Sequence, residues 1–170
     1  MTRAVLDNKR IGRAAQKQET REKILNSALR EFSEKGFDSA SIRNISAAAG
    51  VQHGLIKYHF ESKDKLWRAA VDYLFQRLFS EMEEPREQKS KTRSERVRGW
   101  IHRYVRYCAD HPEHARIMML ESIRDSDRLN WAADKYIREQ HQRLIDSLPG
   151  TLDLKGYPPI ELSSLIYMLN

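Results

Sequence analysis

Apolar residues recur at intervals of three or four along most of the chain, the spacing expected for one face of an α-helix. The first such stripe lies between Thr20 and Gly36 and consists of Ile24, Leu25, Ala28, Leu29 and Phe32. Threonine is a favourable N-cap, and glycine is favourable just past a helix end. The pattern therefore predicts a first helix between these two residues.

Two short helices are predicted next. Ser41 can cap the first of them, and Gly50 ends it. The second begins one or two residues after Gly50 and continues to Phe60. Residues 41–60 then have the size of a helix-turn-helix, in which two helices meet through a tight turn.

Longer helices are predicted in the middle of the chain. Ser62 begins an apolar stripe that extends to Met82. A charged connection follows, and Thr92 with Glu95 has the pattern of a capping box at the start of a fifth helix. Pro112 suits the first turn of a sixth.

The end of the chain contains two further predicted helices. Asp125 or Asp127 can cap a seventh helix that extends to about Leu148, and an eighth covers residues 160–170. Because the eighth stops within apolar residues and has no cap, we expect the natural protein to continue beyond Asn170. No segment alternates as a strand would, so the predicted fold is all-α.

Positive charge is concentrated in the N-terminal third. Residues 1–63 carry 12 Lys and Arg against 7 Asp and Glu, and the whole chain has a net charge of +6. Such an excess favours a polyanionic partner, either nucleic acid or an anionic membrane surface. Residues 1–18 are basic and lack a sustained apolar period. We expect a flexible basic arm there, which could reach DNA or be merely a solvated tail.

The predicted third helix has two different sides. One side gathers apolar residues and a histidine: Leu55, Ile56, His59 and Phe60. The opposite side is polar or small and consists of His53, Gly54, Lys57 and Tyr58. The first side is expected to pack on the two preceding helices, with His59 as a hydrogen-bonded core residue, and the second to project away from them.

The polar side has the chemistry of a major-groove ligand. Lys57 can donate to guanine O6 or N7, His53 to base or phosphate acceptors, and Tyr58 to a phosphate oxygen. Gly54 would let the backbone approach DNA closely. A glycine costs an exposed helix about 1 kcal/mol relative to alanine, so a packing or approach requirement would explain its presence.

Three segments, TREKILNSALREFSEKGF, SIRNISAAAGV and GLIKYHFESKDKL, resemble the DNA-binding domain of the TetR family of bacterial transcriptional repressors. The resemblance extends from Thr20 to about Trp67, and beyond it only the helical layout agrees. It implies a three-helix DNA-binding domain with a helix-turn-helix, followed by a larger helical ligand-binding and dimerisation domain. The expected organisation is the arm at 1–18, the DNA-binding domain at 19–63 and the second domain at 64–170.

The resemblance also implies roles for individual residues. Phosphate contacts are expected from Ser41 and Arg43, base contacts from the third helix, and a backbone clamp from Tyr58 and Lys63. The full expected set of DNA-binding residues is Ser41, Arg43, Gln52, His53, Gly54, Lys57, Tyr58 and Lys63. Leu55 and Lys57 depart from the family, which often has Ser or Thr and Tyr there, so its base preference does not transfer.

A candidate ligand site lies in the predicted second domain. Gln140 and His141 interrupt the apolar stripe of the seventh helix. They could orient a ligand in an apolar cavity together with Trp100, Tyr104, Tyr107, Met118 and Met119. The alternative is a hydrogen-bonded interior or a subunit contact, because buried polar groups usually find partners whatever their function.

Catalytic and metal chemistry have little support in the sequence. His102, His111, His114 and Cys108 do not complete a tetrahedral metal site, and no nucleophile elbow, phosphate-binding loop or dinucleotide fingerprint occurs. A single cysteine, no leader peptide and no membrane-spanning run favour a cytoplasmic location. We expect a protein that is not an enzyme and needs no metal or cofactor.

These observations together favour a transcriptional regulator. The expected form is a repressor that binds a palindromic operator in double-stranded DNA as a homodimer and is released by a small-molecule inducer. One alternative is a DNA-binding regulator that responds to no ligand. Another is a helical adaptor or membrane-surface protein whose basic arm attracts anionic partners, in which Lys57→Ala would leave DNA binding unchanged.

Overall fold

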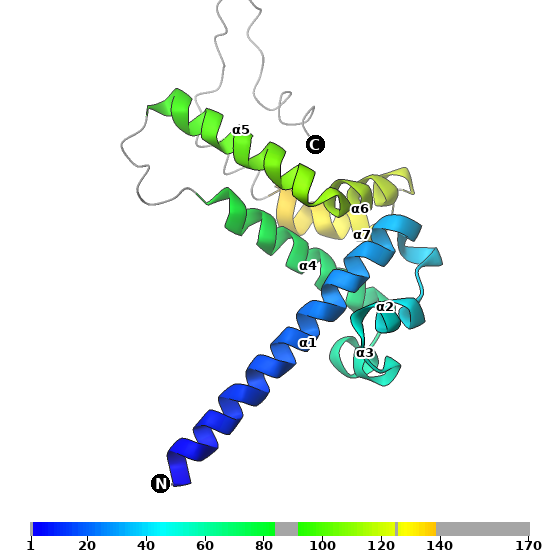
Figure 1. Cartoon of the computed structure of the whole chain (residues 1–170). Helices are drawn as coiled ribbons and strands as arrows, with labels where there is room; N and C mark the ends of the chain where they lie inside the picture. The colour runs from blue at the N-terminus through cyan, green and yellow to red at the C-terminus, as the bar shows by residue number, and fades with distance from the viewer. Residues whose placement is uncertain (1, 84–91, 125, 139–170) are drawn as a thin grey trace, which may run out of the picture. The chain divides into compact units, whose positions relative to one another are not determined.

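The computed structural model describes residues 2–83, 92–124 and 126–138, and every regular element in these ranges is a helix (Figure 1). The elements are α1 (Thr2–Ser39), α2 (Ile42–Ala49), α3 (His53–Phe60), α4 (Lys63–Met82), α5 (Arg93–Asp110), α6 (Pro112–Ile123), α7 (Asp127–Ala132) and the π-helix η2 (Ala133–Arg138). The expected all-α fold is confirmed. None of these helices combines the length and apolar run needed to cross a bilayer.

Helix α1 begins at Thr2 rather than Thr20. The segment 2–18, expected as a flexible arm, is thus the first part of a long helix. Its sequence explains this, because Ala, Arg, Lys and Gln are good helix formers and Gly12 is its one glycine. Such residues can extend a helix without an apolar face when the neighbouring turns, here those after residue 20, are held by packing.

Gly36 interrupts α1 near its end, with φ 72° and ψ 171°, a conformation that side-chain-bearing residues avoid. A Cβ here would also lie 3.1 Å from the Arg124 guanidinium. Arg124 follows α6 and donates to the Asp38 carboxylate at 2.9 Å. The turn after Gly36 is therefore where the end of α6 meets α1.

The core of the first part of the chain forms where α1, α2, α3 and α4 meet. Its fully buried side chains include Ile24, Leu25, Leu29, Phe32, Ile45, Leu66, Trp67 and Leu74. Both α4 and α6 pack on α1. By its contacts the chain divides into two compact units, Met1–Asp125 and Ser126–Asn170, and the expected domain boundary between residues 63 and 64 stays a prediction.

Helix ends follow the sequence signals closely. Ser41 and Ser62 cap α2 and α4, Gly50 ends α2, Thr92 with Glu95 forms the capping box, and Pro112 opens α6. One expectation was wrong: Ser126, rather than either aspartate, caps α7 by accepting from the Leu129 N–H at 3.2 Å. The expected continuation to Leu148 and the eighth helix lie outside the described residues.

Candidate nucleic-acid interface

Helices α2 and α3 form a tight helix-turn-helix. The turn depends on Gly50, whose φ of 65° is in the left-handed region, and its N–H donates to the Ala47 carbonyl at 3.1 Å. The Val51 N–H then donates to the Ser46 carbonyl at 3.0 Å. These two bonds complete the end of α2, and α3 begins at His53.

Helix α3 has the two sides that its sequence predicts. Ile56 and Phe60 are buried, and Leu55 is half-buried. The opposite side is exposed and carries His53, Gly54, Lys57 and Tyr58, the last with 71% of its surface accessible. A short helix held by one face presents the other to solvent with its side chains free to bind a partner.

His59 lies at the edge between these sides. It is half-buried, and its ring packs against those of Tyr58 and Phe60. Burial, followed by the nearby charges of Lys17 and Arg21, lowers the pKa of its imidazole. The expected position toward the core is therefore only partly realised.

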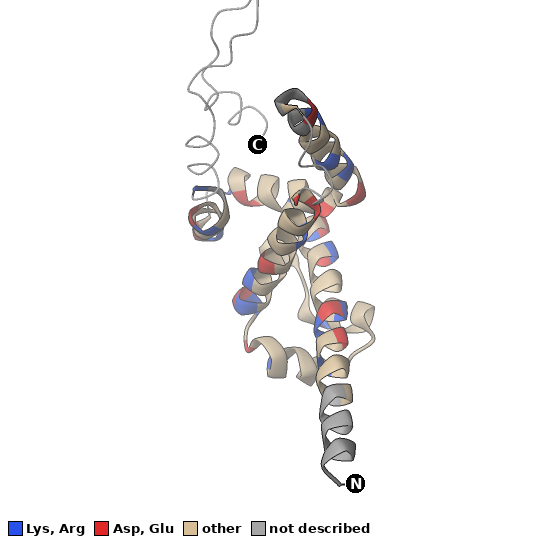
Figure 2. Cartoon of the chain, turned by 90° about the vertical axis from the view of Figure 1, so that its left-hand side faces the viewer, with Lys and Arg blue, Asp and Glu red and all other residues tan. Residues whose placement is uncertain are grey.

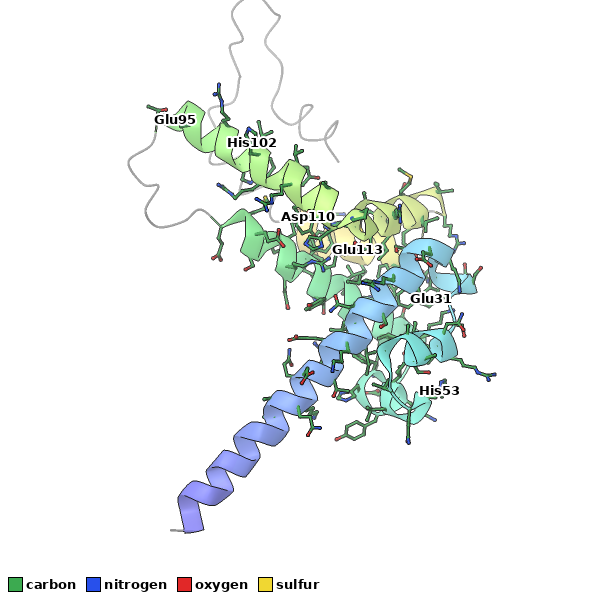
Figure 3. The ribbon with its side chains drawn as sticks, in the orientation of Figure 1. Glu31, His53, Glu95, His102, Asp110 and Glu113 are labelled. Atoms are coloured by element: carbon green, nitrogen blue, oxygen red, sulfur yellow. The ribbon has the colours of Figure 1, made fainter. Side chains whose placement is uncertain are left out.

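The start of α2 is held by a buried carboxylate on α1. Glu31, labelled in Figure 3, comes from α1. Its carboxylate accepts hydrogen bonds from the Ser41 N–H at 3.1 Å, Asn44 Nδ2 at 3.2 Å and Lys35 Nζ at 2.9 Å. Burial alone would raise the pKa of the Glu31 carboxyl, but these hydrogen bonds outweigh it and the pKa is lowered. Glu31 thereby ties α2 to α1.

The remaining predicted contacts of α2 and the turn are accessible. Arg43 is exposed in the first turn of α2, and Ser41 is half-buried because its hydroxyl caps the helix by accepting from the Asn44 N–H. Gln52 is exposed just before α3, and its side chain makes no capping hydrogen bond. Arg43 and Gln52 are thus free to reach a partner, whereas Ser41 is already partly engaged.

Lys63 lies at the start of α4, next to α3. Its Nζ donates to the Asp38 carbonyl at 3.0 Å and lies 4.9 Å from the centre of the Phe37 ring. A shallow hollow of about 150 Å³ brings Lys63 together with His53 and Lys57. Three of the predicted DNA-binding residues therefore line one depression beside α3.

The predicted ligand residues do not share one environment. Trp100 and Tyr104 stack with their ring centres 5.3 Å apart, and Trp100 is 40% exposed. Burial, with Cys108 as a neighbour, raises the pKa of Tyr104, and Met118 is half-buried. Tyr107 is fully buried. Gln140 and His141 lie outside the described residues.

Tyr107, which is buried, and His114, which is half-buried, form a polar pair between helices. The Tyr107 hydroxyl donates to the Leu74 carbonyl at 3.3 Å and lies 2.9 Å from His114 Nδ1, so a neutral His114 with its proton on Nδ1 donates to Tyr107. Burial raises the pKa of Tyr107 to about 12. Burial, then the charge of Arg77, lowers that of His114 to about 4. This pair joins α4, α5 and α6.

Glu31 was not among the functional residues predicted from the sequence. Its one signal is position, since a glutamate between Ala28 and Phe32 lies at the border of the buried stripe of α1. Among the described residues, no group of three or more His, Cys, Asp or Glu side chains could hold a metal ion.

The geometry defines a class of protein: a helix-turn-helix whose second helix is exposed on a polar face, as in major-groove DNA-binding domains. Residues 24–70 match the family model described as bacterial regulatory proteins, tetR family. Over these residues the chain is similar to the TetR family of helix-turn-helix transcriptional regulators. The family consists of DNA-binding proteins rather than enzymes.

Individual relatives agree with this assignment. The regulator AcrR of Shigella flexneri is 50% identical over 50 residues, 29% of this chain and 23% of AcrR. The repressor NicS of Pseudomonas putida is 29% identical over 111 residues, 65% of this chain and 52% of NicS. The matches thus span about a quarter to a half of these relatives.

A solved structure supports the fold over a longer range. A tetR-family transcriptional regulator from Streptomyces coelicolor aligns with a TM-score of 0.58 at 24% identity, covering 83% of this chain and 61% of that one. At this identity the likeness shows the fold alone. The two proteins therefore share an all-helical layout beyond the helix-turn-helix. This likeness says nothing about which residues would bind a ligand.

Proposed function

We propose that this protein is a DNA-binding transcriptional regulator whose helix α3 enters the major groove. The observation that carries the proposal is the exposed side of α3, where Lys57, His53 and Tyr58 project from a helix held by buried Ile56 and Phe60. Hydrogen-bond donors on a protruding helix match the acceptor-rich edge of guanine and the phosphates that border the groove.

Each side chain has a role set by its place. Lys57 would donate to guanine, His53 to a base or phosphate, and Tyr58 to a phosphate. Ser41 and Arg43 at the start of α2 would bind the backbone on one side of the groove. Lys63 would do so only by exchanging its bond to the Asp38 carbonyl for one to a phosphate. That exchange replaces a neutral acceptor with a charged one.

The regulatory form proposed is a repressor that binds a palindromic operator as a homodimer. Two α3 helices must then lie one helical turn of DNA apart, about 34 Å. The names of NicS and of a second relative, the negative regulator IcaR of Staphylococcus epidermidis, support repression. A regulator of this kind would act in the cytoplasm, where bacterial DNA lies.

Release by a small-molecule inducer is part of the proposal. The inducer would bind among α4 to α6 near Trp100 and Tyr104 and favour a state whose two α3 helices are wrongly spaced. The chain of contacts from Arg124 through Asp38 to Lys63 joins the end of α6 to the base of α4 beside α3. A movement of α6 therefore has a direct route to the proposed DNA-binding surface.

Selection of bound duplexes from a random-sequence pool tests the proposal. Enrichment of an inverted repeat with half-sites one helical turn apart is expected. A helical adaptor or membrane-surface protein would enrich no sequence and would bind anionic vesicles instead. That result would overturn the proposal.

Lys57→Ala should lower affinity for the selected operator by about 1 to 3 kcal/mol and relax selectivity at one base pair, because a good base contact discriminates by that amount. Lys63→Ala should weaken operator and scrambled duplexes alike, since a phosphate contact carries no sequence information. Titrations with both duplexes measure the difference. Unchanged selectivity in Lys57→Ala would argue against base recognition by this residue.

Gly54→Ala should separate stability from binding. A Cβ at Gly54 meets nothing within 4 Å, and alanine is the better helix former, so the free energy of unfolding should rise by up to about 1 kcal/mol. If α3 lies close against DNA at this point, operator affinity should fall in the same variant. Thermal unfolding and operator titration together measure this. A stabilised variant with full affinity would show that Gly54 is not at a close approach.

A further inference from the structure

Two basic residues of α1 lie against the exposed edge of α3. The Lys17 ammonium lies 5.7 Å from the centre of the Tyr58 ring, and the Arg21 guanidinium lies 5.6 Å from that of Phe60. Lys17 and Arg21 are four residues apart, so they occupy the same side of α1. Figure 1 shows α1 continuing past α3 toward the N-terminus.

Both cations are available for an anion. Among the residues that the structure describes, neither Lys17 nor Arg21 forms an ion pair with a carboxylate. The acidic residues nearby are engaged elsewhere, because Glu19 pairs with Lys23 at 2.7 Å and Glu22 accepts from Gln18. Figure 2 shows charges of both signs interspersed along the described part of α1. The availability of Lys17 and Arg21 therefore rests on their having no carboxylate partner among the described residues, and not on their belonging to a patch of net positive charge.

The two cations act on the same small region of the surface. Besides burial, it is their charges that lower the pKa of His59, which lies between Tyr58 and Phe60. An anion bound there would offset this positive potential. Lys17 is exposed and Arg21 is half-buried, so each can reach an oxygen without uncovering the core.

Their place relative to α3 indicates the kind of anion. The exposed side of α3 has two edges. Lys63 lies at the edge formed by His53 and Lys57, whereas Lys17 and Arg21 lie at the edge formed by Tyr58 and His59. A helix in the major groove has a row of phosphates on either side of it, since the groove is about 12 Å wide. Cations on both flanks of α3 match both rows.

We propose that Lys17 and Arg21 form a second phosphate-binding site, on α1, that binds the DNA strand on the Tyr58 side of α3. The proposal rests on the proposed function, because it assumes that α3 enters the groove. It adds a contact from outside the helix-turn-helix, and it gives α1 a role in DNA binding besides its role in the core.

The salt dependence of binding to a duplex of scrambled sequence tests it. Each phosphate contact contributes about 0.9 to the slope of log affinity against log salt, so Lys17→Gln/Arg21→Gln should reduce the slope by about 1.8 per subunit. Between 50 and 200 mM salt this amounts to a roughly tenfold smaller change in affinity. Selectivity for an operator should not change.

The matched control removes two charges from the other side of the same helix. Lys23 and Arg30 are exposed, and at 3.6 residues per turn they point away from Arg21 by about half a turn. Lys23→Gln/Arg30→Gln should leave the slope unchanged, because charges farther than about 10 Å from the phosphates are screened. Equal slopes for the two double variants would overturn the proposal.

Arg21 also packs on Phe60, so the double variant could loosen α3. Lys17→Gln alone avoids this and should reduce the slope by about 0.9 per subunit, with thermal unfolding as the check on folding. A wild-type slope in Lys17→Gln would show that Lys17 contacts no phosphate and would overturn the proposed two-residue site. If the wild-type protein itself binds no duplex, the proposed function fails, which is a different result from equal slopes among binding-competent variants.

Discussion

Replacing Glu31 by alanine should lower the free energy of unfolding by about 1.5 to 3 kcal/mol, because partly buried donors lose a charged acceptor. The Ser41 N–H and the Asn44 amide would then lack their partner at the junction of α1 and α2. Chemical denaturation of the wild type and Glu31→Ala measures the difference.

Glu34→Ala is the matched control, since Glu34 is exposed three residues further along the same helix. It should change the free energy of unfolding by less than about 0.5 kcal/mol. Equal stability of the Glu31 and Glu34 variants would show that the carboxylate does not organise this junction.

Glu31 should also make the free energy of unfolding sensitive to acid. The pKa of Glu31 is lowered in the folded protein, so its contribution is present at neutral pH and is lost as the pH falls through that lowered pKa, below the ordinary value of 4.5. Glu31→Gln should lack this part of the pH dependence. Because Glu31 holds Ser41 and the first turn of α2, Glu31→Ala should also weaken DNA binding without touching DNA.

Acidification from pH 7 to pH 4 should cost the wild-type protein about 3 kcal/mol of stability through His114. The pKa of this histidine falls from the ordinary 6.5 to about 4 on folding, chiefly because of burial. The unfolded chain therefore takes up a proton between these values while the folded protein does not, and stability decreases as the pH falls through that window. Each unit of difference corresponds to about 1.4 kcal/mol.

His114→Asn should remove this dependence, because asparagine does not titrate and can still meet the Tyr107 hydroxyl. Tyr107→Phe is the complementary control: it deletes the hydroxyl 2.9 Å from His114 Nδ1 but leaves the histidine buried against Phe75. This variant should be less stable at every pH and yet keep the slope between pH 7 and pH 4. Denaturation midpoints as a function of pH distinguish the two variants. A slope that persists in His114→Asn would assign the effect to other groups.

Local signals predicted most of the helices. Ser41, Gly50, Ser62 and Pro112 mark helix ends where the structure places them, since capping depends on a few neighbouring residues. The two sides of α3 likewise follow from a period of 3.6 residues. Two helix starts differed from the prediction. Ser126 caps α7 where a neighbouring aspartate was expected, and α1 begins at Thr2 because residues of high helix propensity can form a helix without an apolar stripe.

The resemblance of the sequence to a known family predicted the candidate DNA-binding residues, and only the packing of the helices showed which residues hold them in place. Nothing in the spacing of the chain pairs Glu31 with Ser41, or Asp38 with Arg124 86 residues later. Gly36 has a local role as a helix end, but its contact with Arg124 requires α6 to fold back on α1.

By itself the sequence determined the all-α class, the helix-turn-helix and the residues that α3 exposes, because each depends on contacts within about a turn of helix. Only the tertiary structure decided that Lys17 and Arg21 of α1 lie beside Tyr58 and Phe60, that Glu31 holds α2, and that His114 packs against Tyr107. Those contacts join helices far apart in the chain, and their geometry is set by how apolar faces pack.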